Sequence, residues 1–134
     1  MRISKVFTNM PLVADKPIEI GVRAMCEVCG KCAKVCPGHA ISFDKPTTEG
    51  LTISNNHGIC KWYINPEKCF QFWVRNKGDC ANCIRVCVFN KPDTLPHSFV
   101  RWYVKNLPRF DSFYLWMDDL FGYGKRLKMG EIWK

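Results

Sequence analysis

The chain has 134 residues, a formal net charge of +8 and nine cysteines. This length favours one domain with a core of its own, and no apolar run approaches the roughly 18 residues that span a bilayer. Because the cysteine count is odd and most cysteines fall into two tight groups, we expect metal ligation rather than a set of disulfide bridges.

The positive charge does not require a nucleic-acid partner. Eight thiolates and two 4Fe–4S cores together would lower the charge of the loaded protein to about +4. No basic stripe with interleaved stacking aromatic residues is present, so we expect no nucleic-acid binding. Residues 1–17 also lack an apolar signal segment and a twin-arginine pair, so this chain carries no recognisable export signal.

The first half of the chain contains few long periodic segments. Asp15 is a predicted cap for a short helix that would include Pro17 and run into the first cysteine. A helical turn is expected over residues 30–35, because cysteines three residues apart return to one face. Residues 40–43 and 61–64 have the pattern of two short strands that could pair, and residues 44–58 form a polar, turn-rich loop.

The last third is predicted to be helical and rich in aromatic side chains. One amphipathic helix is expected over 97–106, and a second over 111–124 with Asp111 as its N-cap and Gly122 as its stop signal. Residues 99–134 hold ten of the 18 aromatic residues in the chain. Such a surface normally packs on something, so we expect an interface here.

The first cysteine group has the complete spacing of a ferredoxin ligand run. It reads C-x2-C-x2-C-x3-C-P and ends at Pro37. In two-cluster ferredoxins the first three cysteines of such a run bind one 4Fe–4S cube, and the fourth binds the other. The first cube is therefore assigned to Cys26, Cys29, Cys32 and Cys87, and the second receives Cys36, Cys80 and Cys83.

The second group, C-x2-C-x3-C, lacks one ligand, for which Cys60 and Cys69 are the candidates. We favour Cys69, because it follows a proline-containing turn and residues 70–79 can fold out as a loop that returns through Gly78. Cys60 borders a predicted strand, where a small buried apolar role suits it better. Zinc is the alternative metal, but zinc sites do not need a four-cysteine run ending in proline.

Other polar residues give no catalytic pattern. His39, His57 and His97 are interpreted as surface or turn histidines. Asp118 and Asp119 are adjacent and so lie on different faces of a helix, which suits a solvated or structural role better than an acid–base pair. We therefore predict no catalytic residue in this chain.

Five segments together resemble the C-terminal part of corrinoid-dependent reductive dehalogenases. The resemblance runs from about residue 5 to residue 125. The segments are FTNMPL (7–12), CEVCGKCAKVCPGHAIS (26–42), KWYINPEKCFQFW (61–73), DCANCIRVCVFNKP (79–92) and WMDDLFGYG (116–124).

This resemblance implies a cofactor chain and several partners. In that family, a preceding domain binds a cobamide and holds a tyrosine proton donor, and two 4Fe–4S clusters pass electrons to cobalt, which reduces the carbon–halogen bond of an organohalide. A twin-arginine signal exports such enzymes to the outer face of the cytoplasmic membrane, where a small membrane protein anchors them, and an upstream donor supplies electrons. We therefore expect this chain to be an iron–sulfur fragment that is inactive alone.

The resemblance also suggests a wall for the substrate channel. Its candidates are aromatic residues near the second group of cysteines, with ordinary core packing as an equally good explanation. They are Trp62, Tyr63, Phe70, Phe72 and Trp73.

The predicted fold class is α+β: a bacterial-ferredoxin-like module with two 4Fe–4S clusters, short strands and an aromatic-rich helical tail. Residues 1–25 form a lead-in segment and helix, 26–92 the cluster domain, and 93–134 a tail that packs on the absent cobamide-binding domain. The alternatives are a stand-alone ferredoxin-type carrier and a protein similar to epoxyqueuosine reductase.

Overall fold

The structure, a computed structural model, describes residues 6–128, which are mainly helices and loops. Its elements, in chain order, are α1 (Val22–Cys29), α2 (Lys31–Val35), α3 (Pro66–Asn76), α4 (Asn82–Arg85), α5 (Leu95–Asn106), the 3-10 helix η1 (Pro108–Phe110) and α6 (Asp111–Leu120).

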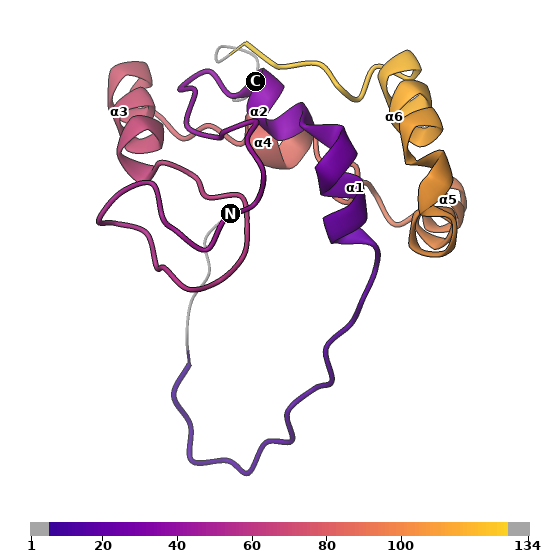
Figure 1. The fold of residues 1–134 in the computed structure, drawn as a ribbon, viewed down its shortest axis with the longest axis horizontal. Helices are drawn as coiled ribbons and strands as arrows, with labels where there is room; N and C mark the ends of the chain where they lie inside the picture. The colour runs from indigo at the N-terminus through magenta and orange to yellow at the C-terminus, as the bar shows by residue number, and fades with distance from the viewer. Residues whose placement is uncertain (1–5, 129–134) are drawn as a thin grey trace.

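The helices form a central group with one arm on each side (Figure 1). Helices α1 and α2 follow one another in the centre, and α4 packs beside α2. Helix α3 lies on one side, while α5 and α6 pack together on the other, with α6 against α1. Residues 6–20 run as an extended segment away from the helices. No helix within residues 6–128 combines the length and the apolar character needed to cross a bilayer.

The two predicted strands meet but do not form a sheet, so the α+β prediction is wrong for the described residues. Ile41 bridges Ile64, and Thr47 bridges Lys61, both in antiparallel fashion and both in isolation. The segments therefore pair as expected, but only at single positions. Proline limits the pairing, because Pro66 begins α3 two residues after Ile64 and a proline has no N–H to donate to a ladder.

The side chain of Tyr63 organises the loop over residues 44–58 in place of a sheet. Tyr63 is buried, and its hydroxyl group lies 3.2, 2.8 and 3.1 Å from the carbonyl oxygens of Thr48, Asn56 and Ile59. Only one of these contacts can use the hydroxyl proton at a time, so the group serves as a shared donor for three loop carbonyls. The loop itself is as predicted.

One predicted helix start and one predicted helix cap are wrong. Helix α1 begins at Val22 instead of following Asp15, because Gly21 at φ 77 adopts a left-handed conformation that interrupts a right-handed helix. Asp111 is the first residue of α6 and is buried, while Phe110 takes the cap position. The 3-10 helix η1 runs directly into α6, so no extended residue is left to act as a side-chain cap.

Residues 70–76 lie in a helix, which corrects the loop expected there. Asn65 caps α3 by accepting a hydrogen bond from the backbone N–H of Lys68 at 2.9 Å. The helix ends at Lys77, whose φ is 55°, and the Gly78 N–H returns to the Trp73 carbonyl at 3.2 Å. The return through Gly78 was predicted; the helical path to it was not.

The predicted helical turn over 30–35 is confirmed as α2, the helix over 97–106 as α5, and the first ten residues of the helix over 111–124 as α6.

Together α1, α5 and α6 enclose the main apolar cluster, formed by Met25, Val104 and Leu115. Burying a side chain of this size contributes about 1.5–3 kcal/mol. Cys29 packs against this cluster, so the helical tail and the first cysteine group share one core.

Candidate iron–sulfur centre

The first three cysteines of the first group lie around one cavity of about 780 Å³. Gly30, at φ 57, lets the chain turn between α1 and α2, so two short helices bring their cysteines to the same space. The four thiols predicted to hold the first cube all line it: Cys26, Cys29, Cys32 and Cys87.

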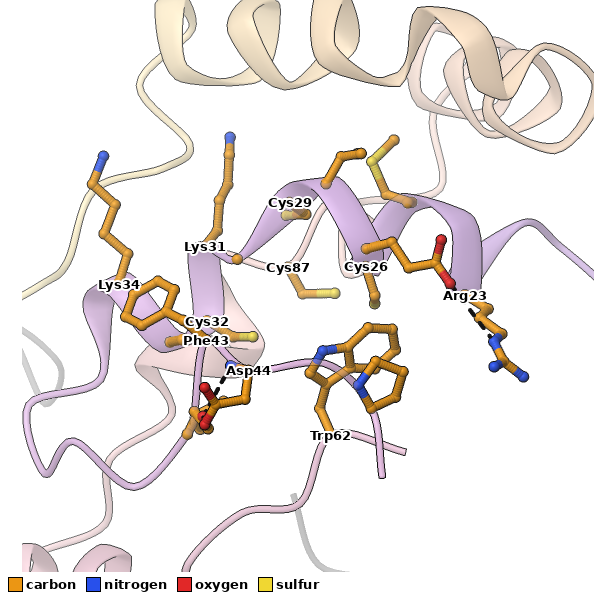
Figure 2. Close-up of a pocket in the computed structure, with 18 of the residues that line it drawn as sticks. Arg23, Cys26, Cys29, Lys31, Cys32, Lys34, Phe43, Asp44, Trp62 and Cys87 are labelled. Carbon is orange, nitrogen blue, oxygen red and sulfur yellow. Dashed lines mark hydrogen bonds and ion pairs between the residues drawn. The ribbon is translucent and has the colours of Figure 1, made fainter. Parts of the chain in front are cut away.

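Figure 2 shows the side chains of Cys26, Cys32 and Cys87 directed toward a common space, with the ring of Trp62 on its far side. Lys31, which lies in sequence between Cys29 and Cys32, extends in the opposite direction. The cavity wall therefore carries sulfur and aromatic groups beside charged residues such as Arg23 and Asp44, and the Lys31 side chain points away from the shared space.

Burial and mutual repulsion favour the protonated form of three of these thiols. Burial, together with the nearby Cys29, Cys32 and Cys87, raises the pKa of Cys26 to about 11. Burial also raises the pKa of Cys29 and of Cys32. Four thiolates could share this space only with a compensating positive charge, which the iron atoms of a cluster supply. The donor set therefore fits a soft, sulfur-ligated iron centre.

The second set of thiols comes from three segments. Cys69 lies on α3, Cys36 caps the end of α2, Cys83 lies on α4, and Cys80 lies in the loop just before α4. Burial raises the pKa of Cys69, and so do the nearby Cys36, Cys83 and Cys80. The Ala40 N–H donates to the Cys36 sulfur at 3.3 Å.

The structure thus places the predicted ligands in two neighbouring sets, one with Cys87 and one with Cys69. The sets are adjacent, since Cys83 adds to the charge repulsion that raises the pKa of Cys32. Within residues 6–128, no three side chains of His, Cys, Asp or Glu meet closely enough to hold a single metal ion. Ligation of the two cubes by these two sets stays a prediction.

The ninth cysteine, Cys60, does not have the buried role expected of it. It is exposed, its sulfur lies 3.8 Å from the Arg23 guanidinium, and it lines the same cavity as the first set. The reason is the missing sheet: Lys61 makes only an isolated bridge, so nothing covers its neighbour.

The five aromatic residues suggested as a channel wall do not form one surface. Tyr63 is buried among the loop carbonyls, which supports ordinary packing for that residue. Trp62 lines the first cavity. On α3, Phe70 is 63% exposed and Trp73 is 38% exposed, whereas Phe72 lies so close to Gly38 that a Cβ added there would come within 3.1 Å of the Phe72 Cβ. For the four other than Tyr63, the channel wall stays a prediction.

The histidines occupy the turn and surface positions expected of them. His39 and His57 are exposed, and His97 is half-buried at the start of α5. His39 has a φ of 46°, and the ring of His57 accepts a hydrogen bond from the Gly50 N–H at 2.9 Å. None of the three lines the cysteine cavity.

A buried ion network beside the first set is absent from the sequence-based predictions. The Lys31 ammonium lies 2.7 Å from Asp118 Oδ2 and 2.8 Å from Asp119 Oδ1, and it donates to the Leu115 carbonyl at 3.3 Å. Burial alone would lower the pKa of Lys31, but the hydrogen bonds from its ammonium to the two carboxylates outweigh burial and raise it. From sequence alone, a lysine between two predicted cysteine ligands is expected to be an exposed loop residue. Its pairing with Asp118 and Asp119 is therefore evident only in the folded chain.

Comparison with known protein families defines the class of protein to which the chain belongs. The profile of the 4Fe-4S dicluster domain family matches residues 25–91, which contain both cysteine groups. The chain belongs to this family and is a two-cluster 4Fe–4S protein.

The relatives that match almost the whole chain are reductive dehalogenases. The tetrachloroethene reductive dehalogenase of Sulfurospirillum multivorans is 43% identical over 133 residues, which cover 99% of this chain and 26% of that protein. A tetrachloroethene reductive dehalogenase of Desulfitobacterium hafniense is 38% identical over 98% of this chain and 25% of its own length. The chain therefore spans about a quarter of the length of these curated relatives.

A solved structure agrees with this relationship. A catabolic reductive dehalogenase superposes with a TM-score of 0.73 at 31% identity, covering 87% of this chain and 16% of the other. A second solved reductive dehalogenase with the same scores is described in connection with B12-dependent dehalogenation.

Proposed function

We propose that this chain is the electron-transfer part of a reductive dehalogenase, relaying electrons through two 4Fe–4S clusters to a corrinoid cobalt that reduces an organohalide. The observation that carries the proposal is the pair of adjacent four-cysteine sets within a chain that is 43% identical, over almost its whole length, to a tetrachloroethene reductive dehalogenase. A stand-alone carrier or a protein similar to epoxyqueuosine reductase accounts for the cysteines but not for that extent of identity.

The proposed role of the chain is to hold two one-electron centres close together in partly dry surroundings. The clusters, when bound, supply the one-electron steps. Cys32 and Cys83 belong to different sets, yet the charge of Cys83 reaches Cys32, so electrons would cross a short distance. The Lys31 N–H donates to the Cys29 sulfur and lowers the pKa of that thiol against the effect of burial. Such hydrogen bonds to ligand sulfurs are one means by which a protein sets cluster potential.

The corrinoid, the organohalide and the remaining protein partners belong to the longer polypeptide that we propose. A wide apolar face on α5 and α6 supports a contact with it, since Phe99, Trp102, Phe113 and Trp116 are each more than half exposed. Exposed aromatic surface of this extent marks an interaction site. Export by the twin-arginine route, attachment to the outer face of the membrane by an anchor protein and an upstream electron donor are part of the same proposal.

Cluster potentials test this function directly. The chain is reconstituted anaerobically, its iron is counted, and the midpoint potential of each cluster is measured by redox titration with electron paramagnetic resonance. We expect about eight irons per chain and at least one cluster with a potential low enough to reduce cob(II)alamin, measured in the same buffer. If the midpoint potentials of both clusters were far above that of the Co(II)/Co(I) couple, electron delivery to a corrinoid would be contradicted. An ordinary electron carrier would then be favoured.

A further inference from the structure

One carboxylate joins the two chain segments that carry the first cysteine set. Asp118 Oδ2 lies 2.7 Å from the Lys31 ammonium, and Asp118 Oδ1 lies 3.2 Å from the Lys91 ammonium. All three side chains are largely buried, with exposed fractions of 13%, 8% and 6% for Asp118, Lys31 and Lys91. Lys31 sits between two cysteines of the first set, and Lys91 follows Cys87 by four residues.

The chain beyond α6 then makes a matching contact with the second set. The side chain of Asn82 is almost completely buried; its Oδ1 accepts from the Leu127 N–H at 3.1 Å, and its Nδ2 donates to the Leu127 carbonyl at 3.3 Å. Asn82 Nδ2 also lies 3.6 Å from the Cys80 sulfur. A neighbouring side chain, Arg85, donates to the Lys125 carbonyl at 2.7 Å. The tail thus pairs with α4, the helix that carries Cys83.

We propose that residues 118–127, here called the C-terminal clasp, position both cluster-binding loops, through Asp118 at the first cluster and through the pairing of Asn82 with Leu127 at the second. Figure 1 shows the segment that follows α6 running back across the molecule to the region of α2 and α4. Asp118 and Asn82 act through other residues, so they are positioning residues rather than ligands. The proposal rests on the two cysteine sets as cluster ligands, but not on the corrinoid or the organohalide.

Residues 123 and 124 pack closely against the ion network beside the first cysteine set. A Cβ on Gly124 would overlap the Asp119 carboxylate, so the tail passes close to this side chain, and a larger residue at position 124 would push the carboxylate aside. Beyond it, Tyr123 places its ring under the Lys91 ammonium, 4.0 Å from the ring centre. The clasp therefore holds the Lys91 ammonium between a carboxylate and an aromatic face.

Charge gives the first half of the clasp a measurable signature. Asp118 and Lys31 bear opposite charges 2.7 Å apart, and Lys31 stands between Cys29 and Cys32 in the chain, so both charges lie beside the first set. Removal of a negative charge beside a cluster stabilises its reduced form and raises its potential. Removal of a positive charge does the opposite.

The first experiment uses the reconstituted full chain and three variants: Asp118→Asn, Asp119→Asn and Lys91→Gln. Asp118→Asn should raise the midpoint potential of the first cluster and leave the second unchanged. Asp119→Asn is the matched control, because Asp119 contacts only Lys31 in this network and is 57% exposed, so its effect should be clearly smaller. Lys91→Gln should lower the midpoint potential of the same cluster. Because this shift has the opposite sign, the test still decides the matter if the Asp118→Asn chain does not take up its clusters.

The second experiment addresses the other half of the clasp. Asn82→Ala, or a chain that ends after Gly124, removes the contact with Leu127 while Asp118 stays in place. Each should speed iron loss from the second cluster to a chelator several-fold and leave the potential of the first cluster unchanged. The truncation retains the Asn82 side chain, so it isolates the tail contact from any local effect of the substitution.

Specific outcomes overturn the proposal. Equal effects of Asp118→Asn and Asp119→Asn, equal shifts of both clusters, or a truncated chain that retains its second cluster as well as the full chain would each do so. Failure of the proposed function is distinguishable, because it appears in the unmodified chain as a low iron count or as potentials above that of the corrinoid couple.

Discussion

Asn65 Oδ1 accepts the backbone N–H of Lys68 at 2.9 Å, so the helix that carries Cys69 is capped four residues before that cysteine and begins at Pro66. The backbone N–H of Asn65 also donates to the Ala40 carbonyl at 2.7 Å. One residue therefore ties the start of α3 to the segment that follows Cys36. The two cysteines that these segments carry belong to the same predicted set, so Asn65 fixes their separation.

Replacing Asn65 with alanine should destabilise both the helix and the second cluster. Loss of an N-cap side chain costs about 1 kcal/mol, and the change is measured by denaturant unfolding of the reconstituted chain. Asn65→Asp is the control, because an aspartate oxygen can accept the same N–H. Equal stability of the alanine and aspartate variants would show that the cap contributes nothing.

The choice between Cys69 and Cys60 as the eighth ligand gives opposite expectations for two serine variants. Cys69→Ser should remove or alter one cluster signal in electron paramagnetic resonance, since Cys69 lies near Cys36, Cys80 and Cys83. Cys60→Ser should leave both clusters intact, with about eight irons per chain. If Cys60→Ser lost a cluster and Cys69→Ser did not, the ligand assignment would be wrong.

Retention of the first cluster should strengthen as pH rises from 6 toward 9. In the absence of iron, the pKa of Cys26 is raised from 9.0 to about 11, so protons compete with iron for this thiol at neutral pH. The cluster-free fold shows the reverse trend: its raised pKa contributes stability below pH 9 that is lost as the pH approaches 11. Iron transfer to a chelator at several pH values measures the first trend. A rate that does not change with pH would contradict it.

The sequence was most informative where ligand chemistry dictates spacing. The run from Cys26 to Pro37 and the choice of Cys69 over Cys60 led to the same two sets of thiols that the structure brings together. The long helices α5 and α6 were also evident, because their apolar periodicity extends over several turns.

Features that depend on distant neighbours could not be predicted in the same way. The strand pattern at residues 40–43 was sound locally, but a bridge of one residue pair is all that the flanking prolines allow. The partner of Lys31 lies 87 residues away at Asp118, and no local pattern links such positions. The exposure of Cys60 likewise depends on distant residues, because the expected sheet that would cover it does not form.

Gly21 should be the least replaceable glycine at the start of α1. Its φ is 77°, and a Cβ there would lie 3.0 Å from the backbone oxygen of Val104. Gly21→Ala should therefore cost more than the roughly 1–2 kcal/mol of a left-handed non-glycine residue, because a helix backbone cannot yield. Gly58→Ala is the control, since Gly58 also has a positive φ but open space around it. Denaturant unfolding should show the larger loss for Gly21→Ala, and equal losses would mean that the contact with α5 is unimportant.

The aromatic face of α5 and α6 should make the isolated chain associate with itself. Phe113 and Trp116 stack on this face with ring centres 5.9 Å apart, and they are 52% and 59% exposed. Nothing in the described part of the chain covers them, so two copies could bury these faces against each other. Sedimentation velocity at rising concentration should show dimers or larger species, and Phe113→Glu with Trp116→Glu should reduce them without changing the iron content. Ser112→Glu, on an exposed neighbour in the same helix, adds charge without removing an aromatic ring. If that control reduced association as much as the double variant, net charge rather than the aromatic face would account for the effect.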